Sequence, residues 1–285
     1  MSALIKRNIK LYYKDKINVF LSLLSILIII GLFVLVLGDM VLTSWMEDLE
    51  QPEVLMYSWL AAGVVAVAAI TIATGAFDVV VGDRVKKINK GFYVSPVKRR
   101  EIVSGYILGG FVTVVAMTLA IFLLWSLYIV WIGGAALSIV GYLQALGVIL
   151  LSSLTGTAIV LYMASLMKSH SAFNTIATIL GTLMGFLMGI YFPIGALPDA
   201  VQTAVRLFPP AHGGMLLRRI IMAPAMEQSF YGIPVEVVEE FEETMGMVFR
   251  FGEFEFTPLM SVMLMLGTAA VFYGLSVLNM RKMGR

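Results

Sequence analysis

The sequence predicts an all-α polytopic membrane protein with six transmembrane helices and both termini in the cytoplasm. The chain has 285 residues, of which 60% are hydrophobic and only 13% are charged, which is too apolar for an ordinary water-soluble protein. Six long runs lack Asp, Glu, Lys, Arg and His, and about 20 helical residues cross a hydrocarbon layer of about 30 Å. The expected spans are residues 19–37, 58–77, 102–132, 143–167, 173–190 and 259–278.

The segments outside these runs alternate in charge, and this alternation predicts the orientation. Most of the 20 Lys and Arg residues lie before the first run, between the second and third, or after the last. Most of the 18 acidic residues lie in the first and fifth loops. Loops rich in Lys and Arg stay in the cytoplasm, so both termini are expected inside. No run contains a proline, so continuous helices are expected.

Residues 1–17 are expected to form a basic amphipathic helix in the membrane interface. Apolar positions recur at helical spacing beside cationic ones, which is typical of a helix that dips into the head-group layer. The helix acts either as a lipid anchor or also as a brace for a cytoplasmic partner, and the pattern leaves both open. The first span is too long for a removable signal peptide, so we expect it to be retained. The apolar positions are Ile5, Ile9, Tyr12 and Tyr13, and the cations are Lys6, Arg7 and Lys10.

The second inner loop, residues 83–101, is far longer than a turn requires. Charged residues flank an apolar cluster, and Pro96 breaks one short helix before another begins. Apolar side chains on a cytoplasmic loop need a cover, which is either the membrane surface or a soluble subunit. We favour the soluble subunit.

The fifth loop, residues 191–258, holds most of the nine prolines and is expected outside as a small helical elaboration. Helices are expected at residues 198–208 and 234–251, each beginning at a proline, and the second is acidic. In the preceding span, glycines recur every fourth residue, so that another helix can pack closely, either within the chain or in a second subunit. These glycines are Gly181, Gly185 and Gly189.

Single polar and aromatic residues also carry expectations. Trp59 is expected as an interfacial anchor. Asp78, at the inner end of the second span, is expected to pair with Arg84 or to reach the interface. His212 is expected in an outer loop, on the opposite side from His170, so the two histidines do not share a metal. No metal site is predicted.

Three segments resemble the permeases of type-2 ATP-binding-cassette (ABC) exporters. Residues 91–102, Gly-Phe-Tyr-Val-Ser-Pro-Val-Lys-Arg-Arg-Glu-Ile, are similar to the loop after the second span, where a short coupling helix precedes a Ser/Thr-Pro turn and a basic patch. Residues 192–198, Phe-Pro-Ile-Gly-Ala-Leu-Pro, and residues 208–212, Phe-Pro-Pro-Ala-His, are similar to the segment after the fifth span. The acidic insertion at residues 227–255 is longer than in compact members.

The resemblance implies a permease that pairs with a second copy or a paralogue above two ATPase subunits, which bind ATP and Mg. A coupling helix at about residues 87–94 would fit a groove on the ATPase, and short external helices would re-enter the outer leaflet. The implied ATPase-coupling residues are Lys87, Lys90, Gly91, Phe92, Tyr93, Val94, Ser95, Pro96 and Arg99. The implied outer-gate residues are Phe192, Pro193, Leu197, Pro198, Phe208 and Pro209.

The absence of nucleotide-binding motifs also favours ATP hydrolysis in a separate subunit. The chain has no phosphate-cradling Gly-x-x-x-x-Gly-Lys-Ser/Thr loop, so ATP hydrolysis is expected in a partner, and it has no cysteine. The predicted function is export of a hydrophobic or amphipathic drug, peptide or lipid-like substrate, with membrane lipids but no nucleic acid as further partners. Spans without charge disfavour an ion-coupled secondary transporter or an intramembrane enzyme. A non-transporting immunity or scaffold protein stays open.

Overall fold

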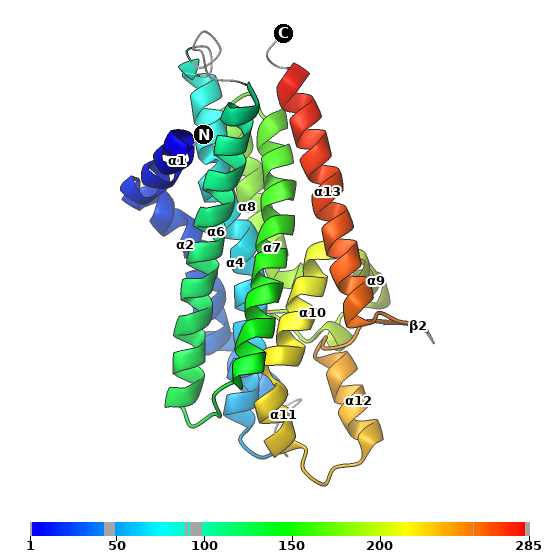
Figure 1. Cartoon of the computed structure of the whole chain (residues 1–285). Helices are drawn as coiled ribbons and strands as arrows, with labels where there is room; N and C mark the ends of the chain where they lie inside the picture. The colour runs from blue at the N-terminus through cyan, green and yellow to red at the C-terminus, as the bar shows by residue number, and fades with distance from the viewer. Residues whose placement is uncertain (1, 43–48, 89–90, 92–98, 253, 283–285) are drawn as a thin grey trace.

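The computed structural model describes residues 2–42, 49–88, 91, 99–252 and 254–282. In these ranges the protein is a bundle of long helices, and the two termini lie at the same end (Figure 1). The first half contains α1 (Ser2–Lys14), α2 (Lys16–Leu32), the π-helical η1 (Phe33–Leu37), α3 (Gly38–Val41), α4 (Pro52–Val85) and α6 (Arg99–Trp131). The second half contains α7 (Ile139–Leu166), α8 (His170–Leu187), the 3₁₀ turn η3 (Ile194–Ala196), α9 (Asp199–Leu207), α10 (Pro209–Ile221), α11 (Ala223–Ser229), α12 (Val235–Thr244), β1 (Arg250–Phe251), β2 (Phe254–Glu255) and α13 (Pro258–Lys282).

Among the described residues, five helices are long and apolar enough to cross a membrane, which confirms the all-α polytopic class. They are Val19–Val41, Pro52–Val85, Glu101–Trp131, Ile139–Leu166 and Pro258–Asn279. α8, which covers the predicted fifth span, is not among them. Its 18 residues correspond to about 27 Å, slightly less than the hydrocarbon thickness. Six spans and cytoplasmic termini therefore stay predictions.

α4 is the central helix of the bundle. It is apolar on all sides, and most of its side chains are buried, because α2, α6, α7, α8 and α10 all pack against it. Small residues bring the neighbouring backbones close. A Cβ on Gly156 of α7 would lie 2.9 Å from the Ala69 carbonyl oxygen of α4, and one on Gly110 of α6 would lie 2.5 Å from the Phe77 ring. The helix begins with Pro52 at a position where no backbone donor is needed.

The first span is helical but not a uniform α-helix. The π-helical turn η1 interrupts it between α2 and α3. The helix is nonetheless continuous over Val19–Val41, as the absence of proline predicts, and the π turn inside it leaves little trace in a run of Leu and Val.

The short helices between α8 and α13, which are predicted to lie outside, form two layers. α10 packs inside the bundle against α4, α7 and α13, while α11 and α12 lie at the end away from the termini (Figure 1). α9 matches the helix expected at residues 198–208. The acidic helix predicted at residues 234–251 is present only over Val235–Thr244. α12 ends at Thr244, because Gly246 turns the chain with a φ of +71°, and β1 and β2 follow as an antiparallel hairpin.

Candidate functional site

A cleft of about 600 Å³ opens between α2, α4 and α8. α2 contributes an apolar wall, and α4 and α8 contribute a wall of hydroxyl and amide groups. The residues lining it are Asp15, Ile17, Leu21, Leu24, Ile28, Thr71, Thr74, Gly75, Asp78, Phe173, Asn174, Ala177, Thr178, Gly181, Thr182 and Tyr191. The lining positions on each helix recur at helical spacing, so each helix turns one continuous face to the cleft.

Asp78 lies at the end of the cleft nearest the termini. Its Oδ1 is 3.0 Å from Nδ1 of His170, the first residue of α8, so the pair joins α4 to α8. Pairing with Arg84 and reaching the interface were the two arrangements expected for Asp78, and the contact with His170 was not foreseen. Arg84 instead donates hydrogen bonds to the backbone carbonyls of Met167 and Ser165, at the end of α7. Three helices therefore meet at this end through polar contacts.

A buried carboxylate clamps α1 to the bundle at the same end. Arg7 donates two hydrogen bonds of 2.8 Å to Asp83, and the Tyr106 hydroxyl donates a third of 2.5 Å. The Asp83 side chain is 5% exposed and that of Arg7 28%. The hydrogen bond to Asp83 raises the pKa of Arg7 above its ordinary value. Because Asp83 lies just before the end of α4, the clamp fixes α1 where the second inner loop begins.

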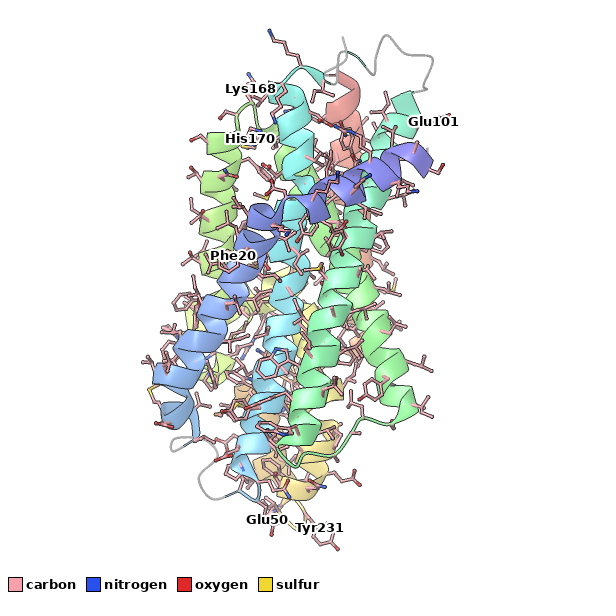
Figure 2. The ribbon with its side chains drawn as sticks, turned by 90° about the vertical axis from the view of Figure 1, so that its left-hand side faces the viewer. Phe20, Glu50, Glu101, Lys168, His170 and Tyr231 are labelled. Atoms are coloured by element: carbon pink, nitrogen blue, oxygen red, sulfur yellow. The ribbon has the colours of Figure 1, made fainter. Side chains whose placement is uncertain are left out.

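Glycines on α6 provide the seat for α1. A Cβ on Gly105 would lie 2.6 Å from Leu4 Cβ, and one on Gly109 would lie 3.0 Å from Asn8 Cβ. Asn8 also donates a 3.0 Å hydrogen bond to the Gly105 carbonyl. Figure 2 shows α1 crossing α4 and α6 near the end that carries Glu101, Lys168 and His170. The expected amphipathic helix is present, but the side containing Asn8 and Tyr12 faces the bundle.

At the other end of the bundle, Arg218 of α10 is fully buried. It donates hydrogen bonds to the carbonyls of Met188 and Gly189, after the end of α8, and its guanidinium lies 5.4 Å from the ring centre of Trp59. Trp59 in turn donates a 2.9 Å hydrogen bond to the Met245 carbonyl. We call Trp59, Arg218 and these carbonyls the outer lock. Trp59 is therefore a core residue and not the interfacial anchor that was expected.

His212 also lies in this region, on α10 and not in a loop as expected. Its Nε2 is 2.9 Å from the Arg206 carbonyl, and its Nδ1 is 2.9 Å from the Ser261 hydroxyl at the start of α13. Since a carbonyl only accepts, Nε2 carries the proton and Nδ1 accepts from the serine. Among the described residues, no group of three or more His, Asp or Glu could hold a metal ion.

The predicted outer-gate residues fall at the borders of the short outer helices. Pro193 precedes η3, Leu197 ends it, and Pro198 caps α9. Phe208 and Pro209 form the junction between α9 and α10, and Phe192 is half-buried just before η3.

The three glycines expected to form one helix-packing face have different surroundings. Gly181 lines the cleft. A Cβ on Gly185 would lie 2.2 Å from the Tyr191 ring of the same chain. Gly189 lies beyond the end of α8, has a φ of +60°, and faces Ile194.

Part of the predicted ATPase-coupling segment is described. Lys87 is exposed with a φ of +57°, and Gly91 is exposed. Only the backbone of Arg99, the first residue of α6, is described. On α1, Lys6 and Lys10 are exposed. The other predicted coupling residues, which are Lys90, Phe92, Tyr93, Val94, Ser95 and Pro96, lie outside the described residues.

Sequence reasoning missed Asp83 and Arg218 as structural charges. Asp83 carries a weak signal, since it is the last carboxylate of the hydrophobic helix before a basic loop. Arg218 carries none, because its partners are backbone carbonyls and an indole that lie far away in the sequence.

The fold and these sites define the class of a multi-pass α-helical membrane protein with a cleft between α2, α4 and α8 and a set of polar contacts at the end near the termini. Residues 43–278 match the family described as "ABC-2 family transporter protein". The chain therefore belongs to this family of type-2 ABC transport permeases, and the resemblance found in the sequence is confirmed. No curated protein matches the chain significantly.

Proposed function

We propose that the chain is the transmembrane permease of an ATP-driven exporter that moves a hydrophobic or amphipathic substrate out of the cytoplasm or the inner leaflet. One observation carries the proposal: α4 lines the cleft with Thr71, Thr74 and Asp78, and the same helix ends at the clamp and at the start of the second inner loop. The groups that would meet the substrate thus lie on one continuous helix, and the loop that would meet an ATPase begins where this helix ends.

In this mechanism ATP and Mg bind to two separate ATPase subunits, and a second copy of the chain or a paralogue completes the pathway. The ATPase pushes on the second inner loop through Phe92 and Tyr93. A helix of 34 residues carries the displacement along its axis towards the cleft, because rigid secondary elements transmit coupling. The Arg7–Asp83 clamp makes α1 move together with the end of α4, so α1 serves as the brace.

An ion-coupled secondary transporter is the second candidate. The Asp78–His170 pair beside the cleft favours it, because titratable groups inside a helical bundle are the usual components of proton and ion relays. The two candidates differ in their energy source, which a transport assay separates directly.

The decisive assay reconstitutes the chain in liposomes with an ABC ATPase subunit that co-purifies with it and follows transport of an amphipathic fluorescent substrate. We expect transport only with ATP and Mg, and none with an ATPase whose catalytic glutamate is replaced. Phe92→Ala together with Tyr93→Ala should abolish stimulated transport while ATP hydrolysis by the isolated ATPase stays normal. Transport by the chain alone on an ion gradient would refute the proposal and establish the second candidate.

A further inference from the structure

The two walls of the cleft differ in chemistry. Four aliphatic side chains of α2 form one wall, and threonine and asparagine side chains of α4 and α8 form much of the other. A volume of about 600 Å³ falls within the range of sites for drug-sized molecules. A ligand that satisfies both walls has a hydrocarbon side and a polar side.

The threonine hydroxyls in the polar wall have already used their hydrogen atoms. Thr71 donates to the Val67 carbonyl at 3.2 Å, and Thr74 donates to the Thr71 carbonyl at 2.7 Å. On α8, Thr178 and Thr182 donate to carbonyls four residues earlier, at 2.9 and 3.1 Å. A hydroxyl has one hydrogen and two lone pairs, so these groups present acceptors to the cleft. These threonines therefore favour a ligand that brings hydrogen-bond donors.

The charged residues that line the cleft are negative, which suits a ligand with a cationic donor group. Among the described residues that line the cleft, Asp15 and Asp78 carry negative charge, and none is Lys or Arg. Lys14 and Lys16 flank Asp15 in the chain and are exposed, but neither lines the cleft. His170, which contacts Asp78, is the nearest titratable group from α8. A carboxylate beside partly buried apolar groups attracts a cation more strongly than one in open water.

From these observations we infer that the cleft binds cationic amphiphiles, with an ammonium or guanidinium group beside Asp78 and a hydrocarbon body along α2. The inference rests on the proposed function, since it names the substrate class of the same cleft. Amphiphiles of equal size with a sulfate in place of the amine lack the donors and carry the wrong charge.

The test measures equilibrium binding of three dansyl-labelled dodecyl probes, an amine, an alcohol and a sulfate, to the full chain in nanodiscs of zwitterionic lipid. Signal from empty nanodiscs is subtracted. We expect the amine to bind saturably and about tenfold more tightly than the alcohol, and the sulfate to bind most weakly. This comparison uses the unaltered protein, so it does not depend on whether any variant folds.

Variants then locate the charge. Asp78→Asn should weaken binding of the amine about tenfold, equal to about 1.4 kcal/mol, and leave the alcohol within twofold. Asp199→Asn removes the same charge from an exposed position of α9 and should change neither affinity. His170→Gln keeps the carboxylate and should keep the preference for the amine.

Equal affinities for the three probes, or no saturable binding because a second copy or lipid fills the cleft, would overturn the inference. Either result leaves ATP-driven export untouched, since export is tested by transport. Conversely, a preference for the amine without ATP-dependent export would remove the proposed function and leave a cation-binding cleft.

Discussion

The Arg7–Asp83 clamp makes the sharpest prediction for stability. Replacing Arg7 by alanine leaves a carboxylate that is 5% exposed with the Tyr106 hydroxyl as its remaining side-chain hydrogen bond among those described. Breaking a fully buried ion pair costs about 3–5 kcal/mol, and an exposed pair contributes about 0–1 kcal/mol. Because Arg7 is partly exposed and Tyr106 stays, we expect Arg7→Ala to lower the free energy of unfolding by about 2 kcal/mol.

The assay is unfolding in mixed micelles titrated with sodium dodecyl sulfate, carried out as a double-mutant cycle. Arg7→Ala, Asp83→Ala and the double variant should show a coupling energy of about 1.5 kcal/mol or more. Lys10→Ala is the matched control, since it removes an exposed cation from the same helix and should change stability by about 0.5 kcal/mol at most. A coupling energy below about 0.5 kcal/mol, or an equal effect of Arg7→Ala and Lys10→Ala, would show that α1 is not held by this pair.

Three further predictions concern the outer half of the bundle. Trp59→Phe keeps an aromatic ring, although a smaller one, and loses the indole N–H that donates to the Met245 carbonyl, so unfolding in the same titration should become easier by at least about 1–2 kcal/mol. An unchanged value would contradict the outer lock. Gly185→Ala puts a Cβ 2.2 Å from the Tyr191 ring and should lower the free energy of unfolding. Gly147→Ala, whose Cβ would have no neighbour within 4 Å, is the control and should be neutral or stabilising. Similar effects of the two substitutions would exclude tight packing at Gly185. Burial lowers the pKa of His212, so its contribution to stability is complete above about pH 6.5 and is lost as the pH falls through the lowered value. His212→Gln should therefore lose less stability than the wild type between pH 7 and 5, and parallel losses would argue against this role.

The class of fold is predictable because it depends on averages over many residues. Apolar runs and charge sorting reflect the cost of placing charge and unpaired backbone in lipid, and both signals survive local variation. The ends of helices are less predictable. α4 extends to Pro52 and Val85, beyond its apolar run, because Pro52 begins the helix and the contacts of Asp83 and Arg84 hold its last turns. α12 stops early because a single glycine takes a left-handed conformation.

The polar sites also include features that the sequence predicts and features that it does not. The cleft falls between helices that cover the first, second and fifth predicted spans, and threonine hydroxyls of α4 and α8 line it. The partners of buried charges could not be predicted, since they depend on which helices meet. Arg218 illustrates the point: in the sequence it is one of a few arginines in the fifth loop, and in the fold its Nη2 donates to two backbone carbonyls just beyond the end of α8.

The arrangement of charge along α4 links these features. Its outer part packs against the outer lock through Trp59, its middle is apolar with two threonines facing the cleft, and its inner end carries Asp78 and Asp83. Buried charges destabilise a membrane bundle unless they are paired, so they persist where they hold elements in register or bind a ligand. Asp83 holds α1, and Asp78 faces both α8 and the cleft. A displacement of the second inner loop therefore reaches the brace and the ligand-facing carboxylate within two turns of one helix, before it reaches the apolar middle. Under the proposed function, energy from a partner ATPase would therefore act first on how the cleft holds the polar end of a substrate.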